Sequence, residues 1–234
     1  MRKKDFLNGL VQGIPIALGY LSVSFGFGIM AVRAGLSVTD ASLISLLNVT
    51  SAGQAAGVDI IASNGTIIEM ILVQLTINIR YALMALSLSQ KLDSSFTFPK
   101  RLIAAYGITD EIFGLCIAQK GRLRPFIMYG IIFISVLGWV LGTFLGAAAG
   151  EILPKSITTA LGIILYGMFI AIIIPPSRKS KNVLFVVILA AICSILFKFL
   201  LPMISSGFSV IICAIVSSVI SAIVFPKEDV ETRA

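Results

Sequence analysis

The chain has 234 residues, of which 58% are hydrophobic and 12% are charged, and its formal net charge is +7. A soluble domain carries about 25% charged residues, so this composition excludes an ordinary soluble protein. The sequence contains no histidine, which excludes serine–histidine catalysis and histidine-containing zinc sites. Cys116, Cys193 and Cys213 lie in apolar segments without paired spacing, so we expect neither a disulfide framework nor a metal site.

Eight apolar segments follow one another along the chain. Most approach the 20 residues or so that a helix needs to cross a bilayer, and the loops between them are too short for a soluble domain. We therefore predict an all-α polytopic membrane protein with a single domain over residues 1–234 and no cofactor. The segments are expected at residues 8–32, 38–64, 66–90, 99–119, 125–149, 156–174, 182–201 and 203–225.

Proline and glycine mark two of these segments. Pro15 lies near the start of the first one. Because proline removes a backbone hydrogen bond, it predicts a helix break or gating point; the alternative is helix packing through small residues. In the fifth segment Gly138, Gly142 and Gly146 are spaced by four, which predicts one face suited to tight helix packing.

The second segment turns polar halfway along its length. After Leu47 too few apolar residues remain for a conventional span, and Gly53 is the expected point of the break. Non-helical backbone at membrane depth is tolerated only where protein or a water-filled cavity satisfies it. The segment therefore predicts a broken or re-entrant helix. Its polar and glycine residues are Asn48, Thr50, Ser51, Gly53, Gln54, Gly57 and Asp59.

Charges lie at membrane depth in two further segments. Arg80 is well inside segment 66–90, whereas Glu69 is expected near the membrane surface. Segment 99–119 is interrupted at its middle by Gly107-Ile108-Thr109-Asp110-Glu111, which predicts a second broken helix. A charge at the bilayer centre costs about 2.5–3.5 kcal/mol on insertion scales, so such residues usually face a cavity or a partner. The candidate partners of Arg80 are Asp59, Asp110 and Glu111.

The distribution of positive charge indicates the topology. If the two broken segments each enter and leave on one side while the other six cross, 14 Lys and Arg residues share one face against two on the other. If all eight segments cross, the counts become 11 against five. We therefore predict about six full transmembrane helices plus two broken or re-entrant segments, rather than eight full spans. Both termini are then cytoplasmic, and Lys91 and Lys120 lie on the same face of the membrane. We attribute the positive net charge to contact with the anionic bilayer surface and not to nucleic acid binding.

Three interpretations of Arg80 stay open: a static ion pair that fixes helix packing, an anion-binding or coupling charge that faces a cavity, and snorkelling to the interface. Broken helices that flank such a charge are typical of transporters, because they offer free N–H groups to a carboxylate and free carbonyls to an ammonium group. An enzyme is not expected. An intramembrane aspartyl protease needs two aspartates within the membrane, and Asp59 and Asp110 could provide them. Residues 107–110, however, lack the GxGD motif that such proteases usually show.

Four motifs resemble the AzlC family, the large subunits of two-component branched-chain amino acid exporters. The match covers roughly residues 8–200, through Gly13-Ile14-Pro15, Thr50-Ser51-Ala52-Gly53-Gln54, Asn78-Ile79-Arg80-Tyr81 and Thr109-Asp110-Glu111. The resemblance implies a multi-pass protein of the cell membrane that exports valine, leucine, isoleucine or analogues such as azaleucine. It also implies a small AzlD-like membrane subunit as partner.

The chain departs from the family pattern at two places. Many members have histidine at the position of Tyr81, and many have a Gly-x-x-Gln pattern at residues 51–54. A histidine-based proton relay is therefore not expected, and in a proton-coupled antiporter Asp59, Asp110 or Glu111 must carry the proton.

The resulting hypothesis assigns a role to each candidate residue. Arg80 is the charge partner or the carboxylate ligand, and Asp110 or Glu111 holds the ammonium group or the proton. Gln54, Asn78 and Thr109 supply polar contacts. The alternatives are a channel or transporter for another small solute, and a structural membrane subunit.

Overall fold

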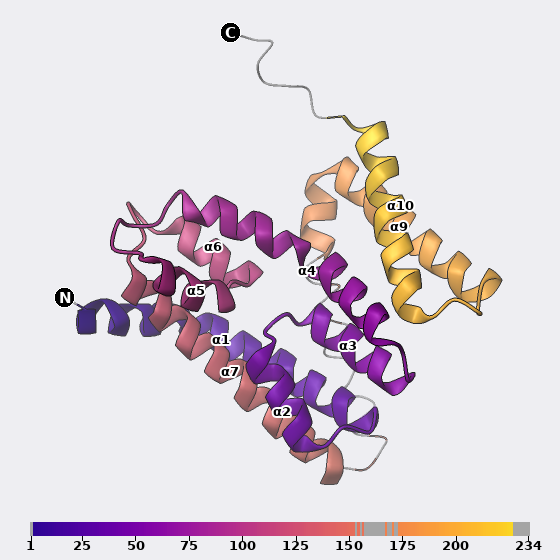
Figure 1. Cartoon of the computed structure of the whole chain (residues 1–234), viewed down its shortest axis with the longest axis horizontal. Coiled ribbons are helices and arrows are strands. Elements are labelled where there is room, and N and C mark those ends of the chain that lie inside the picture. The colour runs from indigo at the N-terminus through magenta and orange to yellow at the C-terminus, as the bar shows by residue number, and fades with distance from the viewer. Residues whose placement is uncertain are drawn as a thin grey trace. The chain divides into compact units, whose positions relative to one another are not determined.

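In this computed structural model the described residues are 2–152, 154, 156, 167, 170 and 173–226. They are predominantly helical, and no strand occurs among them (Figure 1). The chain divides into two compact units, Met1–Val58 with Ile77–Tyr166 and Asp59–Thr76 with Gly167–Ala234. The single domain over residues 1–234 stays a prediction.

Five of the helices are long and apolar enough to cross a membrane: α1 (Arg2–Arg33), α4 (Ile67–Ser89), α7 (Pro125–Ile152), α9 (Lys181–Leu200) and α10 (Ser206–Val224). Between them lie α2 (Val38–Leu47), α3 (Ala52–Ala62), α5 (Phe98–Tyr106) and α6 (Asp110–Ala118). This pattern confirms the polytopic all-α fold with two broken segments. The segment expected at residues 156–174 falls largely outside the described residues.

Helices α1 and α7 pack side by side along most of their length (Figure 1). A Cβ atom on Gly138 would overlap the carbonyl oxygen of Ala17, and one on Gly142 would overlap that of Leu21. Gly146 is equally close to the backbone of α1. The glycine face predicted for the fifth segment is therefore confirmed, because only glycine lets the two backbones approach this closely.

The helix break predicted at Pro15 is wrong, because α1 runs unbroken from Arg2 to Arg33. Proline removes one backbone hydrogen bond, and transmembrane helices tolerate that loss where neighbouring helices hold them. Here α7 holds α1: Gly13, two residues before the proline, lies directly against the backbone of Ile131. A gating role for Pro15 stays a prediction.

The α2–α3 segment is re-entrant. In α2, Ala41 packs with Phe27 and Ala31 near the C-terminal end of α1, and in α3 Val58 returns to the same cluster. The segment therefore enters and leaves at one end of the first unit. Its break spans residues 48–51 and does not include Gly53, which lies in the first turn of α3; the break predicted at Gly53 is therefore misplaced by a few residues. In the observed break Ser51 adopts a φ of 51°, a left-handed conformation that is costly for a residue with a Cβ atom and incompatible with continuing the helix.

The α5–α6 segment is re-entrant from the other end. The loop before α5 is bonded to the loop after α6: the Asp93 N–H donates to the Leu123 carbonyl, and the Leu123 N–H donates to the Lys91 carbonyl, both at 2.9 Å. The Lys91 ammonium group also donates to the Gln119 carbonyl. Lys91 and Lys120 therefore lie at the same end of the first unit, as the predicted common membrane face requires.

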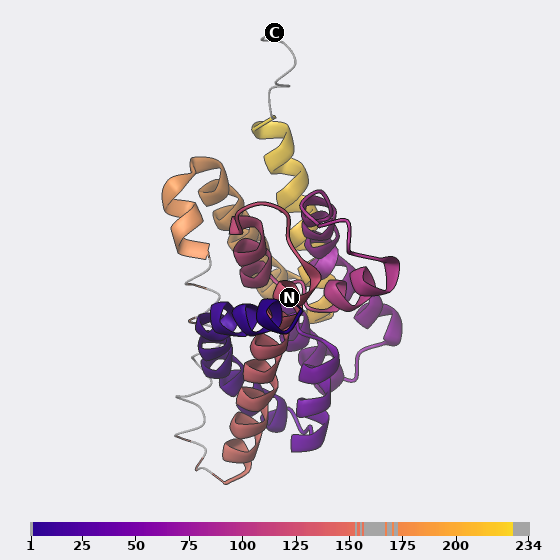
Figure 2. The same ribbon diagram turned by 90° about the vertical axis from the view of Figure 1, so that its left-hand side faces the viewer.

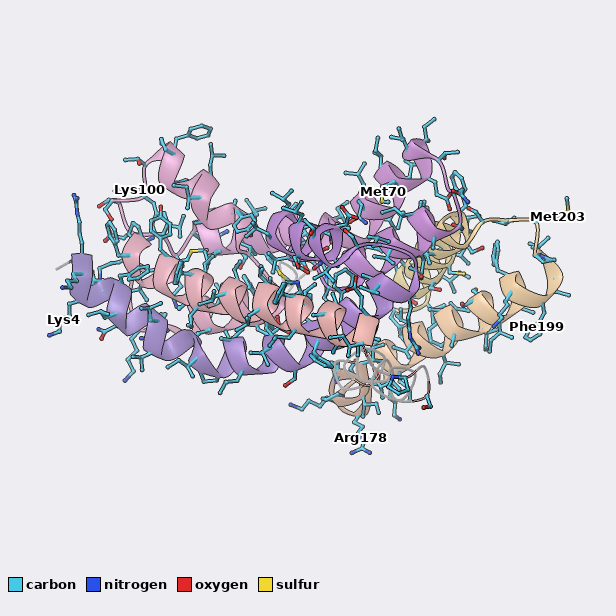
Figure 3. The ribbon with its side chains drawn as sticks, turned by 90° about the horizontal axis from the view of Figure 1, so that it is seen from below. Lys4, Met70, Lys100, Arg178, Phe199 and Met203 are labelled. Atoms are coloured by element: carbon cyan, nitrogen blue, oxygen red, sulfur yellow. The ribbon has the colours of Figure 1, made fainter. Side chains whose placement is uncertain are left out.

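The N-terminal turns of α1 lie at this same end. The Arg124 guanidinium is 3.0 Å from the Asp5 carboxylate, and the Gln119 amide donates to the Gln12 side chain at 2.6 Å. Figures 1 and 2 show α5 and α6 beside the N-terminal half of α1, and Figure 3 shows Lys4 and Lys100 at one end. We call this the basic end of the first unit; it carries Arg2, Lys3, Lys4, Lys91, Lys100, Arg101, Lys120, Arg122 and Arg124.

The second unit contains an α9–α10 hairpin in which the Phe185 and Phe225 rings meet at 5.4 Å. Its main polar contact involves Glu69, which is buried. The Glu69 carboxylate accepts hydrogen bonds from the Ser205 hydroxyl and, at 3.1 Å, from the Gly207 N–H in the first turn of α10. A carboxylate there is favoured because the start of a helix carries partial positive charge. Glu69 thus anchors α10.

Candidate functional site

The break between α5 and α6 positions two carboxylates by helix capping. Thr109 is the N-cap of α6, and its hydroxyl accepts a hydrogen bond from the Ile112 N–H at 3.3 Å. Asp110 and Glu111 therefore fall in the first turn of α6, where the helix dipole favours negative charge. The sequence Thr-Asp-Glu places two acids at the tip of the re-entrant segment.

Gly107 allows this tip to approach α7. It is the C-cap of α5, and a Cβ atom there would overlap the side chain of Ile132. A larger residue would push the break away from α7 and displace the two carboxylates.

Arg80 pairs with Asp110. One guanidinium nitrogen lies 2.9 Å from Asp110 Oδ2 and 3.1 Å from Oδ1. The guanidinium also stands over the Tyr81 ring, 5.1 Å from its centroid, in a cation–π contact. The side chains of Arg80 and Asp110 are 42% and 36% exposed. The pair is therefore formed at the surface of the described chain and not in its core.

Glu111 is held by a tyrosine from α1. The Tyr20 hydroxyl lies 2.6 Å from both Glu111 Oε2 and Thr109 Oγ1. A phenol has one proton, so when it donates to the ionised carboxylate it accepts from the Thr109 hydroxyl. Tyr20 is 7% exposed, which fixes the hydroxyl between the two groups.

A closed network of hydrogen bonds supports the other break. The Gln54 side-chain oxygen accepts from the Trp139 indole N–H, and its NH₂ group donates to the Ser45 hydroxyl, both at 2.9 Å. The Ser45 hydroxyl lies 2.6 Å from that of Thr143, which donates to the Trp139 carbonyl at 3.1 Å. All four side chains are buried. The network binds α2 and α3 to α7 on both sides of the break.

The tips of the two re-entrant segments meet. The Tyr106 hydroxyl at the end of α5 donates to the Leu46 carbonyl in the last turn of α2, one of the carbonyls that a helix end leaves without an intrahelical partner. The Tyr20 and Trp139 rings make an edge-to-face contact with centroids 5.2 Å apart. Because Tyr20 holds Glu111 and Trp139 holds Gln54, the two breaks form one connected polar site.

The structure brings together most of the residues that the sequence singled out. Arg80, Thr109, Asp110 and Glu111 gather at the second break, and Gln54 lies in the network of the first. Asn78 is half-buried on α4, and its role stays a prediction. Asp59 is exposed and lies in the second unit, so its link to Arg80 stays a prediction as well.

Sequence reasoning missed the residues that connect the two breaks. These residues lie in apolar stretches, where a single polar group is a weak signal; they are Tyr20, Ser45, Trp139 and Thr143. A further polar group is Thr50, whose buried hydroxyl oxygen has no hydrogen-bond partner among the described residues. Within that same part of the chain, no group of three or more Cys, Asp or Glu side chains could hold a metal ion.

Comparison with known proteins gives the family. The family model for the AzlC protein matches residues 15–153, more than half of the chain. The chain is therefore a membrane protein that belongs to the AzlC family. No solved structure matches it.

Three relatives are membrane proteins of similar length. An uncharacterized membrane protein of Archaeoglobus fulgidus is 31% identical over 180 residues, which is 76% of this chain and 78% of that one. The inner membrane protein YgaZ of Escherichia coli is 27% identical over 184 residues, 76% of this chain and 75% of its own. An uncharacterized membrane protein of Helicobacter pylori is 23% identical over 201 residues, 83% and 86% of the two chains.

Proposed function

We propose that this protein is a secondary transporter that exports branched-chain amino acids from the cell together with a small AzlD-like membrane subunit. Two re-entrant segments that enter from opposite ends and meet near Arg80, Asp110 and Glu111 are the main support. Arrangements of this kind place half-helix ends and charged groups around a substrate at the middle of the bilayer.

The depth and exposure of the Arg80–Asp110 pair carry the proposal. Arg80 lies nine residues before the end of α4, about 14 Å along the helix axis and close to half of a bilayer about 30 Å thick. More than a third of each side chain is exposed. Charges at that depth face water or protein rather than acyl chains. We therefore infer that this face borders an aqueous path, closed on its other side by the small subunit.

The site offers complementary groups to an amino acid zwitterion. Arg80 is the group for the substrate carboxylate, and the acids at the start of α6 are the groups for its ammonium. Thr50 adds a buried hydroxyl that has no hydrogen-bond partner among the described residues, and such groups commonly meet a ligand or water. Gln54 is 1% exposed and bonded at both ends of its amide, so its proposed role is to hold the first break in place.

Glu111 is the better candidate for the coupling proton. Asp110 is neutralised by Arg80, whereas Glu111 makes its described contact with the neutral Tyr20 hydroxyl. Asp59 is the alternative proton carrier, and Asn78 and Thr109 are proposed to shape the site.

Cells that depend on the chain for resistance to a toxic leucine analogue test the proposal. Arg80→Ala is expected to abolish resistance at unchanged membrane abundance, while Arg33→Ala, far from the site on α1, leaves it intact. Resistance that survives Arg80→Ala at normal abundance would remove Arg80 from the transport path. A structural membrane subunit would confer no resistance in either form.

We also propose that the basic end faces the cytoplasm, as the positive-inside rule requires. Single cysteines that replace Lys91 and Lys120 are expected to react with a membrane-impermeant thiol reagent only after the membrane is permeabilised, in a background without the native cysteines. A cysteine at Ser37 should react in intact cells. Reaction of Lys91→Cys in intact cells would reverse the orientation.

A further inference from the structure

A groove of about 440 Å³ opens on the first unit, and its lining includes neither Arg80 nor Asp110. Its floor runs along α7 from Tyr129 to Val140. Its walls are Phe6 of α1, Ile103 and Tyr106 of α5, and Leu46 of α2. Apart from the tyrosine hydroxyls, the named side chains are apolar.

The groove spans one leaflet of the bilayer. The eleven residue steps from Tyr129 to Val140 correspond to about 16 Å of helix, close to half of a hydrocarbon core about 30 Å thick. Phe6 and Tyr129 mark its outer end, near the basic end of the unit. Leu46 and Tyr106, where the tips of the two re-entrant segments meet, mark its inner end. A straight segment that enters from the basic end and stops at the bilayer centre would fill it.

Two lysines stand at the outer end of the groove. Lys3 lies three residues before Phe6 on α1, and Lys100 lies three residues before Ile103 on α5; residues at this spacing share a helix face. The Tyr129 hydroxyl donates to the Lys100 carbonyl at 2.9 Å, which ties Lys100 to the groove. Its ammonium donates to the Ser95 carbonyl at 2.7 Å, and two of its three N–H groups remain for another acceptor.

We propose that this groove binds one acidic phospholipid of the leaflet at the basic end. An acyl chain occupies the apolar floor, and the phosphodiester lies between Lys3 and Lys100. The depth of one leaflet and the cationic rim together favour this occupant over a transmembrane helix, which would need a face of about 30 Å. The inner end of the chain packs against Leu46 and Tyr106. The lipid thereby supports the contact between the two tips.

Native mass spectrometry of the purified full-length chain tests this proposal. The chain is delipidated in detergent and titrated with dioleoylphosphatidylglycerol or dioleoylphosphatidylcholine. We expect the acidic lipid to bind about tenfold more tightly, since each nearby lysine favours an anionic headgroup. The double variant Lys3→Gln/Lys100→Gln should bring the two lipids close to equal, whereas Lys4→Gln/Lys120→Gln, at the same end, should keep the preference.

A second variant tests the acyl-chain position without touching charge. Leu137 lines the groove and is half exposed, so Leu137→Trp should fill it and weaken binding of both lipids about tenfold at an unchanged melting temperature. Equal binding of the two lipids by the wild type would overturn the proposal. A preference for the acidic lipid that survives Lys3→Gln/Lys100→Gln would also overturn it, as would unchanged lipid binding by Leu137→Trp. Loss of the bound lipid when a small partner subunit is added would overturn it too, because the groove would then belong to that subunit.

Discussion

The Arg80 guanidinium and the Asp110 carboxylate lie 2.9 Å apart, although 30 residues separate them in the chain. One belongs to the long helix α4 and the other to the first turn of α6. The contact therefore joins a membrane-spanning helix to the tip of a re-entrant segment.

A double-mutant comparison separates the structural role of this pair from its functional role. Arg80→Ala is expected to lower leucine efflux at least about tenfold, which corresponds to about 1.4 kcal/mol in the transport barrier. In the double variant Arg80→Ala/Asp110→Ala no charge is left unpaired, so thermal stability should return toward the wild-type value. Efflux should stay low, because the carboxylate ligand is still missing. If the double variant recovered both thermal stability and leucine efflux, the role of the pair would be purely structural.

Tyr20→Phe tests the hydroxyl that holds Glu111. The ring and its contact with Trp139 remain, so the loss of stability should stay near 1 kcal/mol. Leucine efflux should fall, because Glu111 loses the hydroxyl that holds its carboxylate in place. Tyr129→Phe, which removes a hydroxyl that contacts Lys100 instead, is the matched control and should leave efflux unchanged.

Ser45→Ala tests the network at the first break. It removes the partner of the Gln54 NH₂ group and one partner of Thr143, and a buried unsatisfied polar group costs about 1–3 kcal/mol. A clear fall in melting temperature is expected. Ser42 lies on the same helix, and among the described residues its hydroxyl bonds to the Val38 carbonyl of its own turn, so Ser42→Ala should change the melting temperature little. Equal effects of both changes would contradict a special role for the network.

Gly142→Ala tests the close packing of α1 on α7. The added Cβ atom would overlap the Leu21 carbonyl and the Ser24 hydroxyl, and overpacking of this kind costs about 1–3 kcal/mol. Gly19→Ala is the control, because a Cβ atom there meets nothing within 4 Å. It should be neutral or slightly stabilising, since alanine favours the helical conformation by about 0.5–1 kcal/mol. Similar melting temperatures for the two variants would contradict the packing role.

The sequence predicted the two broken segments for a clear physical reason. Polar runs such as residues 48–54 and 107–111 cannot lie in acyl chains, so they had to mark interrupted helices. The lysine and arginine distribution then placed both ends of segment 99–119 on one side, and the hydrogen bonds around Lys91 and Leu123 agree with that placement.

Other features depend on contacts that no local pattern encodes. Pro15 resembles a helix breaker, but packing on α7 keeps α1 continuous. Gln54 resembles a substrate ligand, yet its amide is bonded to Trp139 and Ser45 from helices far apart in the chain. Tyr20 gave no signal of its own, because its importance comes only from the position of α6. Glu69 likewise became a buried anchor only through its contact with α10.

Efflux of radiolabelled leucine from proteoliposomes that contain the chain and its small subunit tests the central claim most directly. We predict that wild-type protein releases leucine at least about tenfold faster than Arg80→Ala protein and that lysine, with a charged side chain, is not released. Leucine efflux at the same rate from wild-type, Arg80→Ala and protein-free vesicles would contradict the assignment of this site to amino acid export.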